Sequence, residues 1–310
     1  MPELITSPSN PKIKRLLALQ QKSSARRESG LFVVEGQREL QHCIDAGFEI
    51  DSIFVCPEVE TAAAPENRSH PRLRKREGPA GLGEEAASSL ASLRPKDCGR
   101  GPAQPDVFRG WPPRNEGQTK EFEVSREVYA KIAMREGTEG VIAEVRTPER
   151  KLEDIALPER PLVVVLESVE KPGNLGAVLR SADAAGADAV LICDPLTDLW
   201  NPNLIRASIG AVFTVPCVAC SSADAIAFLK ERDIRILTAQ LQDSSLYYDC
   251  DMTGGTAIVM GTEATGLTPV WREAADAHIR IPMLGRLDSL NVSVSAAILL
   301  FEAVRQRQNG

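Results

Sequence analysis

The feature that most constrains the fold is a regular alternation of apolar, strand-like runs and helical stretches over residues 161–310. A helical stretch follows most of these runs, as "GNLGAVLRSADAAG" follows "PLVVVLESVEKP". The runs are "LVVVLE", "AVLIC", "VFTVPCV", "IRILTAQ", "TAIVMG" and "HIRIP". Parallel strands covered on both faces have this continuous apolar character, and helices connect them. We therefore expect an α/β fold with a mainly parallel sheet between two layers of helices.

The preceding half predicts a smaller α/β unit over residues 1–147. A helix is expected from Pro11 to a stop at Gly30, then the strand "LFVVEG", a helix closed by Gly47, and the strand "IDSIFVC". A strand, a helix capped by Ser125 and the strand "GVIAEV" complete the unit. Residues of about 57–119 are crowded with Pro, Gly, Ser, Arg and Glu, which indicates a disordered insertion. Residues 148–160 are expected to be a linker to the C-terminal domain at 161–310.

Composition excludes several classes of protein. The 310 residues contain no run near the roughly 20 apolar residues of a membrane helix, and the first residues lack a signal-type segment, so a cytoplasmic protein is expected. The three histidines and seven cysteines form no nucleophile motif. Cys217 and Cys220 are spaced C-x-x-C, but no second pair lies nearby, which favours core packing over a metal site. No metal is therefore predicted.

The net charge of −7 conceals a locally basic stretch between Pro11 and Arg38. Seven cations stand there against Glu28 and Glu35 alone: Lys12, Lys14, Arg15, Lys22, Arg26, Arg27 and Arg38. From charge alone, a solvated helix face and an anion-binding surface remain equally open.

Three loops that follow strand-like runs hold the residues best suited to catalysis or ligand binding. Open parallel sheets bind ligands at such positions. The first loop is "EKPGNLGAVLR", in which Gly173 and Gly176 permit close backbone approach. A helix expected to begin near Asn174 offers free N–H groups, and Arg180 lies about 9 Å along it. Taken alone, this loop favours an ordinary βα turn with a surface arginine over a ligand site.

The second loop, "VMGTEATGLTP", carries Gly261 and Gly266 with Glu263 between them. It lacks the lysine of a phosphate-binding P-loop, and Glu263 would repel a phosphate. A neutral or cationic ligand suits this loop better, although Glu263 could instead cap the next helix.

The third loop leads into the helix of "SLNVSVSAAILLFEAVRQR". Ser289 is expected to be its N-cap. Asn291, Ser293 and Ser295 exceed what capping requires, at the start of an otherwise apolar helix. This pattern indicates side chains that face a ligand or a partner.

Together the three loops resemble the signature motifs of the SpoU/TrmH branch of the SPOUT RNA methyltransferases. The resemblance rests on "NLGAVLR", "GTEATGL" and "IPM" with "SLNVSVS", in the order and spacing of that family from Leu162 to Gln306. Residues 7–43 are similar to the ribosomal-protein-like substrate-binding domain that many members carry. The resemblance implies a C-terminal SPOUT domain with a trefoil knot, a homodimer, and transfer of a methyl group from S-adenosylmethionine to a ribose 2′-hydroxyl of RNA.

The resemblance also assigns roles to individual residues. The implied cofactor-binding residues are Gly261, Glu263, Gly266, Leu267, Ile281 and Leu290. The implied catalytic, RNA-facing residues are Asn174, Arg180, Ser289 and Asn291, with Arg180 completing the partner subunit's site. Phosphate contacts are then expected from Lys12, Lys14, Arg15, Arg26, Arg27 and Arg38.

The predicted chemistry needs neither histidine nor metal, because a sulfonium methyl is already activated and requires mainly alignment. Arg180 is expected to orient the hydroxyl and the adjacent phosphate, since an arginine pKa above about 12 makes it a poor base. Ribosomal RNA is preferred over transfer RNA as substrate, because the additional N-terminal domain suggests a large structured target.

Two other readings stay open at this point. A Rossmann-type dehydrogenase would grip a ribose with Asp194, but the chain has G-x-x-G where G-x-G-x-x-G is required. A non-catalytic RNA-binding protein could keep the fold alone. The presence of Asn174, Arg180, Glu263 and Asn291 argues against that reading.

Overall fold

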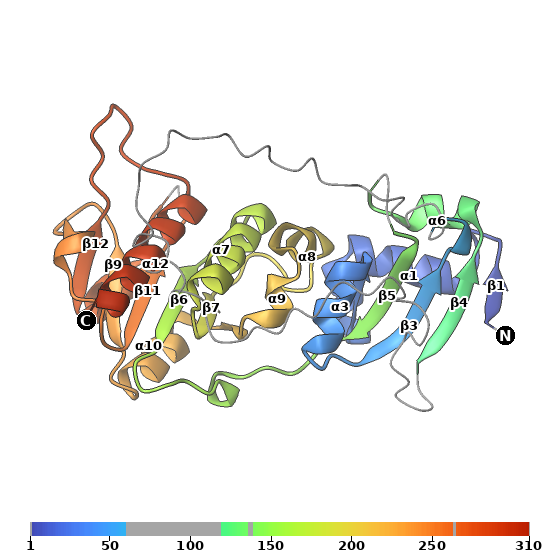
Figure 1. Cartoon of the computed structure of the whole chain (residues 1–310), viewed down its shortest axis with the longest axis horizontal. Helices are drawn as coiled ribbons and strands as arrows, with labels where there is room; N and C mark the ends of the chain where they lie inside the picture. Colours follow the sequence, from blue (N-terminus) through green and yellow to red (C-terminus); the bar gives the residue numbers. More distant parts are fainter. Residues whose placement is uncertain (1, 60–118, 136–138, 263–264, 310) are drawn as a thin grey trace, which may run out of the picture. The chain divides into compact units, whose positions relative to one another are not determined.

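The C-terminal domain is built on a seven-stranded sheet whose strand pairs are all parallel (Figure 1). This computed structural model describes residues 2–59, 119–135, 139–262 and 265–309. The strand order is β10-β12-β9-β11-β6-β7-β8. The strands are β6 (Leu162–Glu167), β7 (Ala189–Cys193), β8 (Cys217–Cys220), β9 (Arg235–Ala239), β10 (Ser245–Leu246), β11 (Thr256–Met260) and β12 (Ala277–Arg280). The expectation of a mainly parallel sheet is confirmed.

Helices cover both faces of this sheet, which explains why β6, β7 and β11 are buried along their whole length. On one face, α7 (Pro172–Ala185) and α12 (Val292–Asn309) pack against each other, and α12 contacts β11 (Figure 1). On the other, α10 (Ser222–Lys230) and α11 (Pro269–Ala274) pack together and contact β9. The remaining helices are α8 (Pro202–Ser208), α9 (Ala211–Thr214) and the short 3-10 helices η2 (Leu152–Asp154) and η3 (Tyr247–Asp249).

One predicted strand of this domain is partly wrong. The run "VFTVPCV" contains the one-turn helix α9, and β8 begins only at Cys217. Ile209 and Gly210 both have positive φ, of 55° and 86°, and this left-handed turn starts a new helix. Apolar residues are buried in either conformation, so their pattern did not reveal the helix.

The N-terminal domain contains a five-stranded mixed sheet in the order β1-β4-β3-β5-β2. Strands β1, β4 and β3 are mutually parallel, and β5 is antiparallel to both β3 and β2. The strands are β1 (Glu3–Ile5), β2 (Leu31–Glu35), β3 (Ile50–Val55), β4 (Lys120–Val124) and β5 (Val141–Arg146). The helices are α1 (Pro11–Gln21), α2 (Ser23–Ser29), α3 (Gln37–Asp45) and α6 (Arg126–Ile132). The smaller α/β unit expected from the sequence is thus present.

Two details of this unit differ from expectation. The single helix expected from Pro11 to Gly30 is broken at Lys22, whose backbone is extended, although Gly30 ends it in a left-handed conformation as expected. Strand β1 was not foreseen, because three residues are too few to show a period. Most of the predicted insertion near 57–119 lies outside the described residues. In the predicted linker, Leu152, Ile155 and Leu157 pack against the core of the C-terminal sheet.

Candidate active site

A cavity of about 400 Å³ lies at the carboxyl ends of β9, β11 and β12. Its volume is in the range of small-molecule sites. It is lined by residues of four segments, 239–242, 260–267, 279–283 and 288–295, and by Arg272. The second and third loops of the sequence analysis therefore converge on one cavity. Of the predicted cofactor-binding residues, Gly261, Gly266, Leu267, Ile281 and Leu290 line it.

The loop after β11 is folded tightly on itself. Gly261 lies so close to Gly266 that a methyl group on its Cα would overlap the Gly266 carbonyl. Gly266 has a φ of 67°, which side-chain-bearing residues rarely adopt. The hydroxyls of Thr262 and Thr265 lie 2.8 Å apart across the loop. Both glycines are therefore required for its shape, whereas Glu263 lies outside the described residues.

A buried carboxylate fixes the far end of this loop. Glu167, at the end of β6, is 3% exposed. It accepts hydrogen bonds from the backbone N–H of Thr268 at 2.8 Å and from the Thr268 hydroxyl at 2.5 Å. The 261–268 loop is thus tied to the strand that precedes the first motif.

The third motif contributes both lining residues and a helix cap. Ser289 and Leu290 line the cavity. The prediction that Ser289 caps the helix is wrong, because α12 begins at Val292. Asn291 is the cap instead, since its Oδ1 accepts from the Ser293 backbone N–H at 3.0 Å and from the Ser293 hydroxyl at 2.6 Å.

The first and third motifs meet through two asparagines, although 117 residues separate them in sequence. Asn291 donates a hydrogen bond from Nδ2 to Oδ1 of Asn174, at 3.1 Å. The predicted RNA-facing side chains of these two motifs are therefore adjacent.

Helix α7 begins at Pro172, two residues before the predicted start at Asn174. Gly176 does not face the cavity. A Cβ at that position would lie 2.6 Å from the Cβ of Ala207, so this glycine permits close packing of α7 on α8. Gly173 has open space around it. Arg180 is exposed farther along α7 and does not belong to the described cavity lining.

The six predicted phosphate contacts differ in their exposure and in their partners. Lys14, Arg27 and Arg38 have exposed side chains, although Arg38 pairs with Glu39. Lys12 pairs with Glu3 and lies over the ring of Phe122. The remaining two, Arg15 and Arg26, have structural partners.

The prediction for Arg26 is wrong, because this side chain is only 5% exposed. Its guanidinium forms an ion pair with Asp198 at 2.6 Å and donates to the backbone carbonyl of Leu19 at 2.5 Å. A buried arginine with two such partners is not available to an RNA phosphate.

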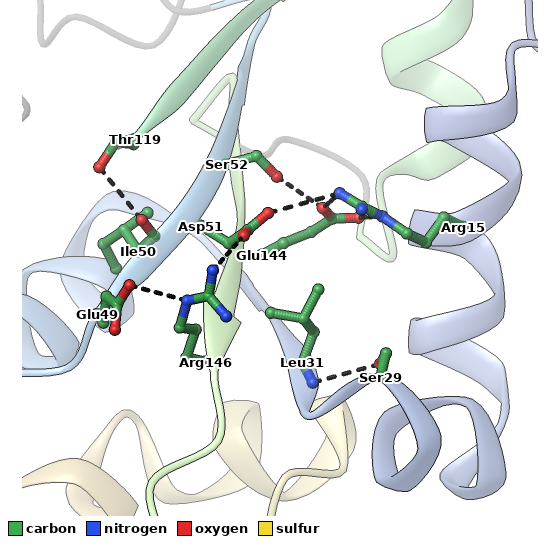
Figure 2. Close-up of polar contacts among 10 residues, drawn as sticks. All are labelled: Arg15, Ser29, Leu31, Glu49, Ile50, Asp51, Ser52, Thr119, Glu144 and Arg146. Carbon is green, nitrogen blue, oxygen red and sulfur yellow. Dashed lines mark hydrogen bonds and ion pairs between the residues drawn. The ribbon is translucent and has the colours of Figure 1, made fainter. Parts of the chain in front are cut away.

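Arg15 belongs to a polar network beneath α1 (Figure 2). Its guanidinium forms a bidentate ion pair with Glu144, which is fully buried and also accepts a hydrogen bond from the Ser52 hydroxyl at 2.6 Å. Burial alone would lower the pKa of Arg15, but the hydrogen bond and charge of Glu144, together with the charge of Asp51, raise it. Arg15 therefore neutralises buried acids, although 43% of its side chain is still exposed.

In the part of the chain that the structure describes, the cysteines and the possible metal ligands do not form a second reactive site. The buried Cys217 thiol donates to the carbonyl of Val212, and burial raises its pKa. The sulfur atoms of Cys220 and Cys193 lie 3.9 Å apart. Within the described ranges, no group of His, Cys, Asp and Glu side chains could hold a metal ion. None of the described helices combines the length and apolar character needed to cross a bilayer.

Sequence reasoning missed part of the cavity lining. The 240–242 loop after β9 carries no glycine and no charged residue, and its two glutamines do not distinguish it from a connecting loop. Arg272 also lines the cavity. It lies on α11, outside the three motifs, and only its position shortly after "GTEATGL" could have indicated it.

Two family models match the chain. Residues 161–301 match the SpoU rRNA Methylase family, and residues 10–79 match the MRM3-like substrate binding domain. The 23S rRNA (guanosine-2′-O-)-methyltransferase RlmB of Salmonella typhi is 40% identical over 176 residues, which are 54% of this chain and 72% of that protein. The RlmB of Vibrio cholerae is 39% identical over 191 residues, or 60% of this chain and 77% of that protein.

Solved structures resemble nearly the whole chain. A crystal structure of an RNA 2′-O ribose methyltransferase has a TM-score of 0.70 and 35% identity, and the match covers 98% of this chain and 99% of that one. The AdoMet-bound rRNA methyltransferase of Sinorhizobium meliloti has a TM-score of 0.74 and 27% identity, with 98% and 97% covered.

The chain belongs to the SpoU rRNA methylase family. The predicted fold class, a knotted SPOUT domain with a smaller N-terminal α/β domain, is confirmed. The predicted enzyme class, an S-adenosylmethionine-dependent RNA 2′-O-ribose methyltransferase, is also confirmed. The Rossmann-type and non-catalytic readings are set aside.

Proposed function

We propose that this protein methylates the 2′-hydroxyl of a guanosine in 23S ribosomal RNA, the reaction for which its RlmB relatives are named. Two observations carry the proposal. The second and third family motifs line one cavity, and the first and third meet through the hydrogen bond between Asn291 and Asn174. The match of residues 10–79 to a substrate-binding domain supports ribosomal RNA over transfer RNA.

The cavity fits S-adenosylmethionine. Its volume of about 400 Å³ is adequate for a nucleoside with an amino-acid moiety, and Gly261 leaves backbone exposed where a side chain would fill the loop. We assign the adenosyl part to the backbone of Gly261, Ile281 and Leu290. Gly266, Leu267 and Glu263 are assigned to shaping the pocket around it. When bound, the cofactor supplies an electrophilic methyl group on its sulfonium.

The protein's own contribution is to align the ribose hydroxyl and to assist removal of its proton. Asn174, Asn291 and Ser289 are assigned to holding the target nucleotide, because the two asparagine amides are adjacent and Ser289 lines the cavity. Arg180 orients the hydroxyl and the neighbouring phosphate, and the phosphate oxygen receives the proton.

The basic part of the N-terminal domain is proposed to hold the flanking RNA. Lys14, Arg27 and Arg38 are among its exposed cations, and phosphate contacts of this kind provide most non-specific affinity. Lys12, Arg15 and Arg38 contribute less, because each is paired with a carboxylate. In this proposal residues 1–147 bind substrate, 148–160 link the domains, and 161–310 perform the transfer.

The working form is proposed to be a homodimer in the cytoplasm, where the ribosomal RNA is found. Arg180 lies outside the described cavity lining, so it is assigned to the partner subunit's site. Exposed apolar side chains on α12 and in the loop before it support a self-association surface.

The proposal is tested by mapping 2′-O-methyl groups in total RNA from cells with and without the gene. One guanosine of the 23S RNA should lose its methyl group in the deletion strain and regain it with the wild-type gene. Restoration of a transfer RNA site, with 23S RNA unchanged, would contradict the proposed substrate.

A further inference from the structure

Two arginines line the cavity, Arg272 on α11 and Arg280 at the end of β12. Neither belongs to the residues that the family motifs assign to the cofactor. Asp288 is the other charged residue among the described lining residues. The cofactor, in contrast, carries two positive groups, its sulfonium and its ammonium, and only one carboxylate. Each arginine would therefore repel the sulfonium and the ammonium of the cofactor and attract only its carboxylate.

Helix α11 presents Arg272 from a rigid base. The neighbouring Trp271 is fully buried, and its indole N–H donates to the Ser222 hydroxyl at 3.0 Å. Thr268, immediately before the helix, is held by Glu167 through two hydrogen bonds. The start of α11 is thus anchored at two points, while Arg272 itself is exposed toward the cavity.

The two arginines differ in their surroundings. Arg280 directs Nη1 to the Ser244 hydroxyl at 3.4 Å. No hydrogen bond or ion pair to the Arg272 guanidinium is found among the residues that the structure describes. The N–H donors of the Arg272 guanidinium are therefore available to a ligand.

We propose that Arg272 binds the carboxylate of the amino-acid moiety of S-adenosylmethionine. This inference rests on the proposed function and makes Arg272 a specificity-determining residue of the same site. A guanidinium matches a carboxylate with two parallel hydrogen bonds, and it repels the ammonium and the sulfonium. Arg272 thereby fixes which end of the cofactor lies at α11 and selects against nucleosides that lack the carboxylate.

The test is calorimetric titration of the full chain with S-adenosylmethionine and with its decarboxylated analogue, which keeps the sulfonium and the amine. The wild type should bind the intact cofactor more tightly. Arg272→Ala should weaken that binding by about 10- to 100-fold, as expected for a charged hydrogen-bonded pair. It should leave binding of the analogue unchanged or tighter, so that the two affinities become similar. Arg272→Lys, which keeps the charge but not the fork, should be intermediate.

Arg280→Ala is the matched variant, since it removes a second cation from the same cavity lining. It should preserve the preference for the carboxylate. Lys230→Ala, at the exposed end of α10, controls for a general loss of charge. If Arg272→Ala weakens both ligands equally, or if Arg280→Ala abolishes the preference, the assignment of Arg272 is overturned while the proposed function stands. If the wild type binds no S-adenosylmethionine, the proposed function itself fails.

Discussion

Arg180 is an exposed side chain on α7, and its position restricts the roles open to it. It lies outside the described cavity lining, so its side chain is not a wall of the cavity assigned to the cofactor. Its assigned partners are the ribose hydroxyl and a phosphate, which are present only when RNA is bound. A substitution should therefore separate the transfer reaction from cofactor binding.

We expect Arg180→Ala to lower the rate of RNA methylation by at least about 100-fold, the effect typical of losing one group that stabilises a transition state. The affinity for S-adenosylmethionine should stay close to the wild-type value. Single-turnover methyl transfer and calorimetry measure the two quantities. Lys230→Ala is the control for loss of an exposed cation. An Arg180→Ala protein with normal turnover would remove this residue from the mechanism.

Glu35, at the end of β2, makes folding stability depend on pH. Burial raises the pKa of this carboxyl, although the Met134 backbone N–H, Arg135 and Arg206 partly oppose the effect. Because the pKa is higher in the folded than in the unfolded state, the folded state binds more protons between the two values. Stability is therefore lost as the pH rises from about 4.5 through the folded pKa.

Glu35→Gln should abolish that loss, since glutamine still accepts the Met134 hydrogen bond without a charge. At pH 7 the variant should be more stable than the wild type, and near pH 4 the difference should vanish. Urea unfolding at both pH values measures the free energies. A constant difference across this range would show that the charge of Glu35 is not the cause.

The predicted RNA contacts show that residue type alone does not determine which cations are available to RNA. The sequence indicates that cations are dense between Pro11 and Arg38, and Lys14 and Arg27 are indeed exposed. It does not indicate that Arg15 and Arg26 have acidic partners, because the partners of these two residues are distant in sequence. Asp198 lies 172 residues from Arg26, and Glu144 lies 129 residues from Arg15.

At the scale of elements, the loop after β11 depends on the close approach of Gly261 to Gly266. A methyl group on Gly261 would overlap backbone atoms, which cannot move aside as a flexible side chain would. The loop would have to open, and Leu267 and Thr265 line the same cavity. The free-energy cost of such overpacking is about 1–3 kcal/mol.

Gly261→Ala should accordingly weaken S-adenosylmethionine binding by about tenfold or more, with only a moderate fall in melting temperature. Gly254→Ala is the matched control, because Gly254 precedes the same strand and has open space around it. Calorimetry and thermal unfolding of both variants separate the local effect from a general one. Equal affinities for the two variants would contradict the role of this close approach.

Periodicity predicted the elements well where one environment persists along an element. The strands β6, β7 and β11 are buried throughout, and their apolar runs located them closely. Prediction failed at the ends of elements and at the junctions between them, where the conformation of one or two residues determines which element forms. Asn291, not Ser289, caps α12, and both are good capping residues. Residues 211–214 form a helix because of the left-handed turn before them, which apolar composition does not record.

At the scale of the whole molecule, α12 presents apolar side chains to solvent in a single chain. Phe301 and Val294 are 48% and 46% exposed and lie two turns apart on one side of the helix. Leu284 and Leu287, in the loop before α12, are 97% and 76% exposed. Exposed apolar side chains of this size are candidates for an association site, and a second copy of the chain is the proposed occupant.

Phe301→Glu should convert the dimer to a monomer, with the dissociation constant raised at least about 100-fold by a charge buried in the interface. Light scattering coupled to gel filtration measures the mass. Val270→Glu is the matched control, because Val270 is also exposed but lies on α11, on the opposite face of the sheet. A Phe301→Glu protein that stays dimeric would place the interface elsewhere.

The proposed dimer and the proposed role of Arg180 together predict that each site is shared between two subunits. Arg180→Ala subunits keep an intact cofactor cavity, and Gly261→Ala subunits keep Arg180. In a mixed dimer, the cavity of the first subunit and Arg180 of the second form one complete site, whereas the other site carries both lesions. At a cofactor concentration well below the dissociation constant of the Gly261→Ala cavity, both variants should have little activity, and activity should therefore return when their subunits exchange.

For equal amounts and random exchange, half of the dimers are mixed and each has one intact site, so about a quarter of the wild-type rate should return. The measurement is methyl transfer to RNA after co-refolding or prolonged incubation of the two variants. Mixing Arg180→Ala with Arg180→Ala,Gly261→Ala controls for exchange without complementation and should give no recovery. If Arg180 instead serves its own chain's site, every site in the mixed dimer is defective, and the rate stays at the level of the separate variants.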